Sequence, residues 1–237
     1  MLHSKIYYIC QLIALSLLYN AIIIPIMYHI PHFKASNDQE VLDFMKAHPF
    51  AMLCGVAENG FPVATHIPVL VEEREGTLFI LGHLMRKQEH TLAFEKNNQA
   101  LLVFSGPHAY VSASWYEDQA VASTWNYAAV HATGLLHFLN DEDLLALLIK
   151  LTDTFEGTSQ SPAAVKNMSP EYLKQNMKAI CGFEIEIKKL QHVYKLSQNK
   201  DEKSYHHIIE QLGATGNHQD QSLAKIMATR SHDVFLK

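Results

Sequence analysis

Cysteine, glycine and excess charge are all scarce in this sequence, and each scarcity excludes a class of protein. The three cysteines lie far apart and form neither a CxxC pair nor a disulfide framework, so we expect a reducing compartment, the cytoplasm. The ten glycines include no GxGxxG and no GxxxxGKS/T, which removes the main support for dinucleotide-binding and P-loop proteins. A net charge of −5, without any run of five like charges, does not support strong, sequence-independent binding to nucleic acid.

Signatures of metal and nucleophile chemistry are missing as well. Neither HExxH nor GxSxG occurs. The fifteen histidines include the pair His29 and His32, but no carboxylate partner follows at ligand spacing, so we predict no metal site. Cys54 lies in an apolar run, which is typical of an inert core thiol rather than a nucleophile.

One long hydrophobic run is present, and it is confined to residues 1–26. Of the 21 residues from Ile6 to Ile26, 17 are apolar and none is charged. By length this segment is a candidate transmembrane helix or a signal peptide, although no A-x-A cleavage site follows. We favour a third interpretation, in which translation starts at Met27 and the apolar extension is a mis-assigned start. Residues 27–237 then form a single domain of ordinary composition.

The remaining sequence predicts a mainly β fold with flanking helices. Asn59-Gly60 is a tight hairpin signal, Gly106-Pro107 predicts a strand break, and Ser36 with Gln39 is a capping-box pattern. Six or seven strands joined mostly by short turns favour a closed, largely antiparallel barrel. The strands are expected at 50–57, 61–71, 77–82, 100–104, 108–112, 124–138 and 180–187, and the helices at 36–48, 84–96, 141–155, 170–177, 202–212 and 219–230.

The stretch from Gly82 to Lys87 is the first candidate binding site. A strand ends at the glycine and a helix is expected to begin at Leu84, which places Arg86 and Lys87 in its first turn. Cations are unfavourable at a helix N-terminus, but a bound phosphate would make them favourable there. Two solvated surface charges are the alternative interpretation.

Three further segments are rich in hydroxyls, amides and aromatic rings. They are GPHAYVSASWY at 106–116, STWNYAAVH at 123–131 and KLSQN at 195–199. Small residues allow a flat ring to approach a strand, and hydroxyl and amide groups can bind the edge of that ring. A barrel corner packed with aromatics, a dimer contact and a capped loop are the structural alternatives.

These three motifs, together with MYHIPHF at 27–33, resemble those of the PaiB-type FMN-binding negative transcriptional regulators. The resemblance extends from Met27 to about residue 230. Residues 1–26 have no counterpart in the family, which further favours a start at Met27.

The resemblance implies an FMN-binding split β-barrel related to the pyridoxamine 5′-phosphate oxidases. Such proteins are homodimers with two FMN sites at the subunit interface. In the oxidases a Ser-Arg-Lys run binds the FMN phosphate; Arg86 and Lys87 match that run, whereas Met85 replaces the serine. By the same resemblance, Trp125 and Asn126 contact the cofactor of the partner subunit.

The run from Gln88 to His90 departs from the Asn-Pro-Gln-Trp of many members, and this departure affects the ring pocket. The full set of expected cofactor contacts is Thr65, His66, Pro68, Gly82, His83, Arg86, Lys87, His108, Ser114, Trp115, Trp125, Asn126, Gln198 and Asn199.

The function expected on this basis is that of a flavin-dependent redox or regulatory protein, reduced by a small molecule or a nicotinamide. Two alternatives stay open: a negative transcriptional regulator with FMN as sensory or structural ligand, and a pyridoxamine-phosphate-oxidase-like or haem-handling enzyme. No catalytic residue is assigned, although His66, His83 and His108 titrate in the useful range. The sequence shows no helix-turn-helix, zinc finger or basic stripe, so binding to DNA is not supported. We expect no association with a membrane unless residues 1–26 are translated.

Overall fold

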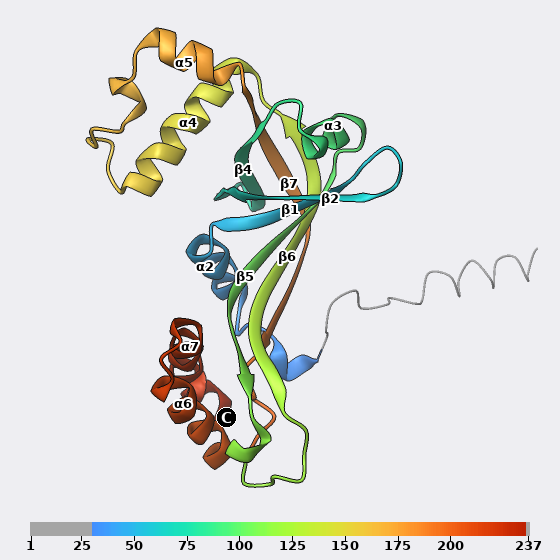
Figure 1. The fold of residues 1–237 in the computed structure, drawn as a ribbon, viewed down its shortest axis with the longest axis vertical. Helices are drawn as coiled ribbons and strands as arrows, with labels where there is room; N and C mark the ends of the chain where they lie inside the picture. Colours follow the sequence, from blue (N-terminus) through green and yellow to red (C-terminus); the bar gives the residue numbers. More distant parts are fainter. Residues whose placement is uncertain (1–29, 236–237) are drawn as a thin grey trace, which may run out of the picture.

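The computed structural model describes residues 30–235, so the expectations for residues 1–26 and for His29 lie outside the described part. Seven antiparallel strands form one sheet in the order β2-β1-β5-β6-β7-β4-β3 (Figure 1). The strands are β1 Phe50–Val56, β2 Pro62–Pro68, β3 Leu70–Arg74, β4 Thr77–Met85, β5 Gln99–Val111, β6 Thr124–Phe138 and β7 Ile180–Lys195. The predicted mainly β, largely antiparallel fold is confirmed, as a curled half-barrel with helices around it.

The sheet curls until strands from its two sides come close together. β2 and β3 are nearly continuous, because only Val69 separates them and its N–H donates to the Pro49 carbonyl at 2.9 Å. A Cβ at Gly82 in β4 would lie 3.3 Å from the Pro68 carbonyl oxygen at the end of β2. The absence of a side chain at Gly82 therefore permits the close approach that shapes this end of the barrel.

The two central strands are longer than the sequence predicts, because bulges absorb their irregularities. The expected break at Gly106-Pro107 is wrong: these two residues lie opposite Ala128 alone in a bulge, and β5 continues through them. A proline is tolerated there because a bulged residue makes no ladder hydrogen bond. A second bulge, at Lys188 of β7 opposite Thr133 and Gly134, allows β7 to pair as far as Lys195 instead of ending at Ile187.

The helices cover the sheet in three groups. α2 and α3 lie beside the barrel, α4 and α5 form a pair at one end, and α6 and α7 pack together at the other end (Figure 1). Leu147 and Leu151 of α4 pack on Leu70 and Leu81 in a small core of their own. The bounds are α2 Asp38–Ala47, α3 Glu89–Lys96, α4 Asp141–Glu156, α5 Pro170–Met177, α6 Glu202–Ala214 and α7 His218–Phe235, with 3-10 turns η1 Pro31–Phe33, η2 Ala113–Trp115 and η3 Val165–Asn167.

The predicted capping box at the start of α2 is displaced by one residue. Asn37, not Ser36, is the N-cap, and its side chain accepts from the Glu40 N–H at 2.9 Å. The Glu40 carboxylate in turn accepts from the Ser36 N–H at 2.6 Å. Asparagine and serine cap equally well, so the sequence pattern did not separate the two positions.

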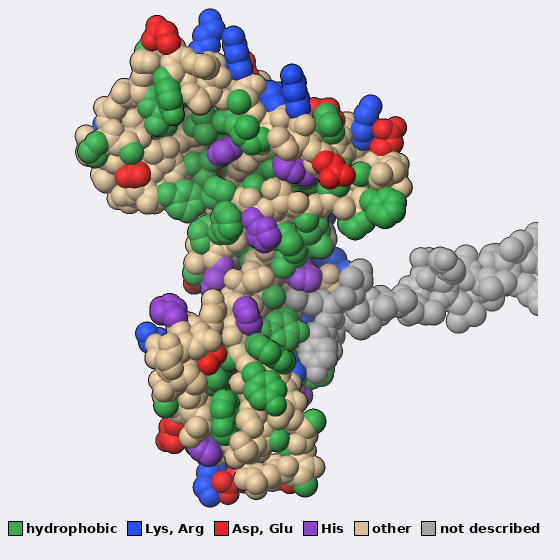
Figure 2. Space-filling model, in the orientation of Figure 1, with side chains coloured by type: hydrophobic (Ala, Val, Ile, Leu, Met, Phe, Trp, Pro, Cys, Tyr) green, Lys and Arg blue, Asp and Glu red, His purple; other side chains and the backbone are tan. Residues whose placement is uncertain are grey.

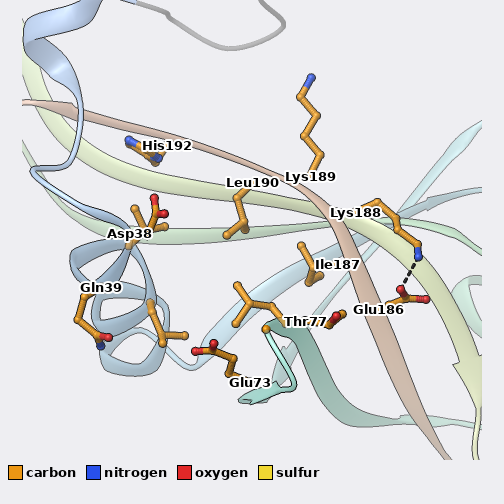
Figure 3. Close-up of a pocket in the computed structure, with 14 residues that line it drawn as sticks. Asp38, Gln39, Glu73, Thr77, Glu186, Ile187, Lys188, Lys189, Leu190 and His192 are labelled. Atoms are coloured by element: carbon orange, nitrogen blue, oxygen red, sulfur yellow. Dashed lines mark hydrogen bonds and ion pairs between the residues drawn. The ribbon is translucent and has the colours of Figure 1, made fainter.

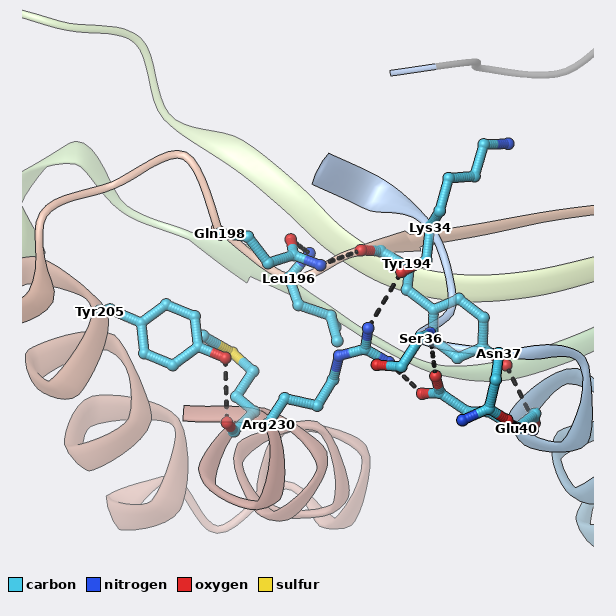
Figure 4. A network of polar contacts seen from close by, with 10 residues as sticks. Lys34, Ser36, Asn37, Glu40, Tyr194, Leu196, Gln198, Tyr205 and Arg230 are labelled. Atoms are coloured by element: carbon cyan, nitrogen blue, oxygen red, sulfur yellow. Dashed lines mark hydrogen bonds and ion pairs between the residues drawn. The ribbon is translucent and has the colours of Figure 1, made fainter. Parts of the chain in front are cut away.

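A polar network joins the C-terminal helices to α2 (Figure 4). Arg230 of α7 forms an ion pair with Glu40 and donates to the Lys34 carbonyl at 3.0 Å. Tyr205 of α6 donates to the Met227 carbonyl at 2.9 Å, which fastens α6 to α7. The two C-terminal helices are thereby held to the N-terminal part of the domain.

Within the described residues, no helix is both long enough and apolar enough to cross a membrane.

Candidate functional site

The turn between β4 and α3 carries the two cations that the sequence singled out. The expected helix start at Leu84 is wrong, because β4 continues to Met85 and α3 begins at Glu89. Arg86 and Lys87 therefore lie exposed in the turn before the helix, not in its first turn. The Arg86 N–H donates to the Ala179 carbonyl at 2.8 Å, and Lys87 has φ +63°. A lysine in this left-handed conformation is uncommon and marks a sharply turned segment.

Arg86 lines a cavity of about 550 Å³ that the sequence did not reveal. Lys174 and Lys178, from α5 and its C-cap, line the same cavity, together with one carboxylate, Asp141. The rest of the wall is largely apolar, formed by Leu145, Pro170, Leu173 and Met177. Three cations beside an apolar wall fit a ligand with an anionic group and an apolar body. A phosphate-bearing flavin has this chemistry.

The residues predicted to line the flavin ring lie on β2 and β4 at the same end of the barrel. Pro68 and Gly82 are brought together, as the 3.3 Å approach shows. Thr65 is half-buried, and His66 is exposed with its ring stacked on Phe50 at 5.9 Å. His83 is half-buried, and burial lowers its pKa. Its neutral form is therefore favoured in the folded protein.

The aromatic residues of the other motifs form a separate group on the long strands. Trp125 on β6 is 55% exposed, and its ring lies 6.1 Å from that of His108 and 6.0 Å from that of Tyr110. Tyr110 and Trp125 are direct cross-strand partners. Exposed aromatic pairs of this kind are typical of an interface or a stacking surface.

Ser114 and Trp115 lie in η2, where the chain leaves β5. Ser114 is exposed, and its hydroxyl lies 2.8 Å from that of Ser112. Trp115 is half-buried against the core, and its carbonyl lies 3.0 Å from Nδ1 of His207 in α6. Trp115 thus joins the β5 end to α6, a packing role of the kind that the alternative interpretation of this segment predicted.

The amide side chains of Asn126 and Gln198 are engaged inside the protomer. Asn126 is fully buried; its Nδ2 donates to the Ser197 hydroxyl at 2.9 Å, and the same hydroxyl donates to its Oδ1 at 3.1 Å. Gln198 donates to the Tyr194 carbonyl at 2.6 Å and accepts from the Leu196 N–H at 2.8 Å. Both side chains therefore bond within their own chain, and their assignment as cofactor contacts stays a prediction. Asn199 is exposed.

The predicted contacts therefore fall into two groups at opposite ends of one protomer. The β4–α3 turn lies near α3 at the upper end of the molecule, whereas the β5–β6 connection lies beside α6 at the lower end (Figure 1). Figure 2 shows hydrophobic and histidine side chains along the narrow region between these ends. A single protomer does not bring the two groups into one site.

A groove of about 630 Å³ between α2, the β3–β4 hairpin and β7 contains none of the predicted residues (Figure 3). Its lining mixes Asp38 and Glu73 with the half-buried Ile187 and Leu190. Carboxylates and cations are interleaved along it, so it favours no single class of ligand by charge.

Metal and thiol chemistry receive no support from the described residues. In residues 30–235 no group of three histidine, cysteine or acidic side chains is placed to hold a metal ion. Burial raises the pKa of both Cys54 and Cys181, so their reactive thiolate forms are disfavoured.

The fold is that of the split-barrel class, and comparison with solved structures agrees. A FAD- and haem-binding protein from Mycobacterium smegmatis superposes with a TM-score of 0.52 at 16% identity, covering 68% of this chain and 72% of the other. A flavocytochrome from Azotobacter vinelandii gives a TM-score of 0.50 at 20% identity, covering 68% of each chain. At this identity the likeness concerns the fold alone.

The sequence comparisons identify the family. Residues 27–189 match the family described as "Putative FMN-binding domain", and the chain belongs to this family. The chain is 34% identical over 201 residues to protease synthase and sporulation protein PAI 2 of Bacillus subtilis, covering 85% of this chain and 96% of that protein. An uncharacterized protein of Saccharomyces cerevisiae is 34% identical over 100 residues, covering 39% of this chain and 59% of that protein. The resemblance to the PaiB type is thereby confirmed.

Proposed function

We propose that this protein binds FMN as a homodimer and acts as a flavin-dependent redox or regulatory protein, with Arg86 and Lys87 at the FMN phosphate. The observation that supports this best is the cavity beside the β4–α3 turn. Arg86, Lys174 and Lys178 line this cavity together with an apolar wall. Arginine offers a planar fork of donors to a phosphate, and each lysine adds a point charge.

The chain's own residues would bind and orient the cofactor. Bound FMN supplies the capacity to accept and donate electrons. The β4–α3 turn fixes the anionic tail, and Thr65, His66 and Pro68 on β2 offer a strand surface for the ring. His83, with its lowered pKa, supplies a neutral imidazole at the same end.

The proposal that the partner is a second copy of this chain rests on the outer face of β6. Along this strand the residues alternate between fully buried and half-exposed, and the half-exposed ones include Tyr127, Ala129, His131 and Leu135. An uncharged, partly apolar face of this kind is typical of a homodimer interface rather than of a solvated surface. Dimerisation would also allow Trp125 of each protomer to approach the cofactor of its partner.

The phosphate assignment is tested by comparing FMN with riboflavin. Replacing both Arg86→Ala and Lys87→Ala removes charge that only the phosphate meets, so FMN affinity falls by about 100-fold or more while riboflavin affinity barely changes. Two charge-assisted contacts are worth roughly 1.5–3 kcal/mol each. Flavin fluorescence quenching measures both affinities. Lys96→Ala, at the end of α3, is the control and leaves both unchanged. An equal loss for FMN and riboflavin would refute the assigned role.

Redox and sensory roles are separated by one spectroscopic experiment. The FMN-loaded protein is mixed with reduced nicotinamide under anaerobic conditions while the visible spectrum is followed. Rapid bleaching supports an oxidoreductase, whereas bound but unreactive flavin supports a sensory or structural ligand. A Soret band after addition of haem in place of FMN would redirect the proposal to haem handling.

A further inference from the structure

A small pocket at the lower end of the molecule brings together three segments that lie apart from the cavity of Arg86, and it includes Asn126 and Asn199 of the expected cofactor contacts. It has a volume of about 400 Å³ and lies between η1, the β5–β6 connection and the loop from β7 to α6. Its lining includes Tyr116, Ser123, Thr124, Asn199 and Lys200. Distant parts of the sequence thus meet around one cavity.

Tyr116 gives this pocket a buried hydroxyl with an unmet hydrogen bond. The side chain is 4% exposed, and its hydroxyl has no hydrogen-bond partner among the described residues. Burial, with a further contribution from Tyr110, raises the pKa of Tyr116, so the hydroxyl keeps its proton at neutral pH. An unpaired buried polar group is costly, and a ligand atom that accepts this proton would remove that cost.

The other polar groups of the lining also favour an electron-rich ligand. The hydroxyls of Ser123 and Thr124 accept from the Ala113 N–H and from Lys195, which leaves each hydroxyl proton to be donated. Lys200 places its ammonium 3.9 Å from the centroid of the Tyr116 ring.

Negative charge is excluded from the described lining. No aspartate or glutamate is among the residues 30–235 that surround the pocket. The nearest acidic residues along the chain are engaged elsewhere: Asp201 accepts from Ser204 at the start of α6, Asp118 accepts from the Ala120 N–H at 3.0 Å, and Glu117 pairs with Lys203 at 2.7 Å. The pocket is therefore rich in donors and carries net positive charge.

The floor of the pocket is held in a fixed shape. Ser197 is buried and has φ +63°. Two hydrogen bonds with the Asn126 side chain hold its hydroxyl in place. The Lys200 N–H donates to the Ser197 carbonyl at 3.0 Å, which closes the turn that presents Lys200. A site whose donors are fixed before binding loses less conformational entropy when the ligand arrives.

We propose that this pocket binds a small oxyanion, the carboxylate or phosphate group of a metabolite, with Tyr116 and Lys200 as its principal ligands. Within one chain the pocket is separate from the cavity that Arg86 lines, because the β5–β6 connection and the β4–α3 turn lie at opposite ends of the molecule (Figure 1). The inference rests on the proposed function and adds an oxyanion site to it. In the redox interpretation it is a candidate position for an anionic substrate, and in the regulatory interpretation for an anionic effector.

The test is a titration of the full-length protein with sodium phosphate and, separately, with sodium acetate, against sodium chloride at matched ionic strength. Backbone amide shifts of Ser123 and Asn199 report binding. Saturable shifts with phosphate or with acetate are expected, and the salt that binds more tightly identifies the oxyanion. Lys200→Met is expected to weaken binding about tenfold and Tyr116→Phe about three- to tenfold, as for the loss of one hydrogen bond.

Lys203→Met is the matched control, because Lys203 lies on the same surface but not in the lining, and it leaves oxyanion affinity unchanged. Thermal unfolding of Tyr116→Phe confirms that the variant is folded. Shifts that are equal in chloride, or an equal effect of Lys200→Met and Lys203→Met, would overturn the proposal. A loss of FMN affinity in Lys200→Met would assign the pocket to the flavin site and also overturn it, whereas the Arg86→Ala test of FMN binding is independent of all these outcomes.

Discussion

Gly134 and Gly82 occupy positions where the neighbouring atoms leave no room for a side chain. A Cβ at Gly134 would lie 2.2 Å from the Glu186 carbonyl oxygen across the β6–β7 bulge. At Gly82 it would lie 2.8 Å from the Phe183 ring. The first contact is with backbone, which cannot rotate away, so Gly134 is the stricter requirement.

Gly134→Ala is therefore expected to destabilise the protein by about 3 kcal/mol, since overpacking costs roughly 1–3 kcal/mol and occasionally more. Gly216→Ala is the control, because no atom lies within 4 Å of its added Cβ and its cost is close to zero. Urea unfolding of both variants measures the difference. Equal midpoints would contradict the structure of the bulge.

Buried tyrosines predict how stability responds to alkali. Burial raises the pKa of Tyr205 to about 12, and it also raises that of Tyr194. An unfolded tyrosine ionises near 10, so ionisation stabilises the unfolded state first. The free energy of unfolding should hold up to about pH 10 and then fall by about 1.4 kcal/mol per pH unit for each such tyrosine. Urea unfolding between pH 8 and pH 11 checks this, and Tyr205→Phe should show a shallower fall.

At the scale of elements, the alternation of apolar residues and the residues typical of turns predicted the strands well, but several strand boundaries were misplaced. β1 and β6 were predicted almost to the residue, because clear alternation and an Asn-Gly turn define them. The break at Gly106-Pro107 failed because a bulge, which is a tertiary feature, accommodates both residues. The start of α3 failed because pairing with β7 extends β4 to Met85.

The candidate site was predictable only in part. Arg86 was singled out as a cation in the first turn of a helix, a position that the structure does not give it, and its role at a phosphate stays a prediction. Lys174 and Lys178 lie 88 and 92 residues further along the chain, and only folding brings them to the cavity that Arg86 lines. Asn126 was expected, from the family resemblance, at the cofactor of the partner subunit, and this stays a prediction. Its burial against Ser197 depends on where β7 ends, which no local pattern encodes.

We expect that loss of the ion pair between Arg230 and Glu40 destabilises the C-terminal helices locally. Its side chains are 12% and 30% exposed. Arg230→Ala leaves a partly buried carboxylate unpaired and is expected to cost about 2–3 kcal/mol, somewhat below the range for fully buried pairs. Amide hydrogen exchange should rise in α6 and α7 more than in the sheet. Lys203→Ala, which breaks the exposed pair with Glu117, should cost less than about 1 kcal/mol. Equal effects of the two substitutions would show that the α7–α2 contact is not stabilising.

At the scale of the whole molecule, the proposed dimer depends on the outer face of β6. His131 lies midway along that strand, and burial lowers its pKa. His131→Glu introduces a charge into the interface and is expected to convert the dimer to a monomer in light scattering at micromolar concentration. His218→Glu, on an exposed helix end, should leave the dimer intact. A dimer that survives His131→Glu would place the interface elsewhere.

The paired strands β6 and β7 also set the length of the molecule. β6 and β7 contain 15 and 16 residues, and at roughly 3.3 Å per residue each spans about 50 Å. Because they are paired along almost all of that length, they form a stiff connection between the end proposed to bind flavin and the end proposed to bind an oxyanion. A pair of fluorophores attached at the two tips should report one constant energy-transfer efficiency, whichever ligand is added, and a change in that efficiency would show that the two strands bend.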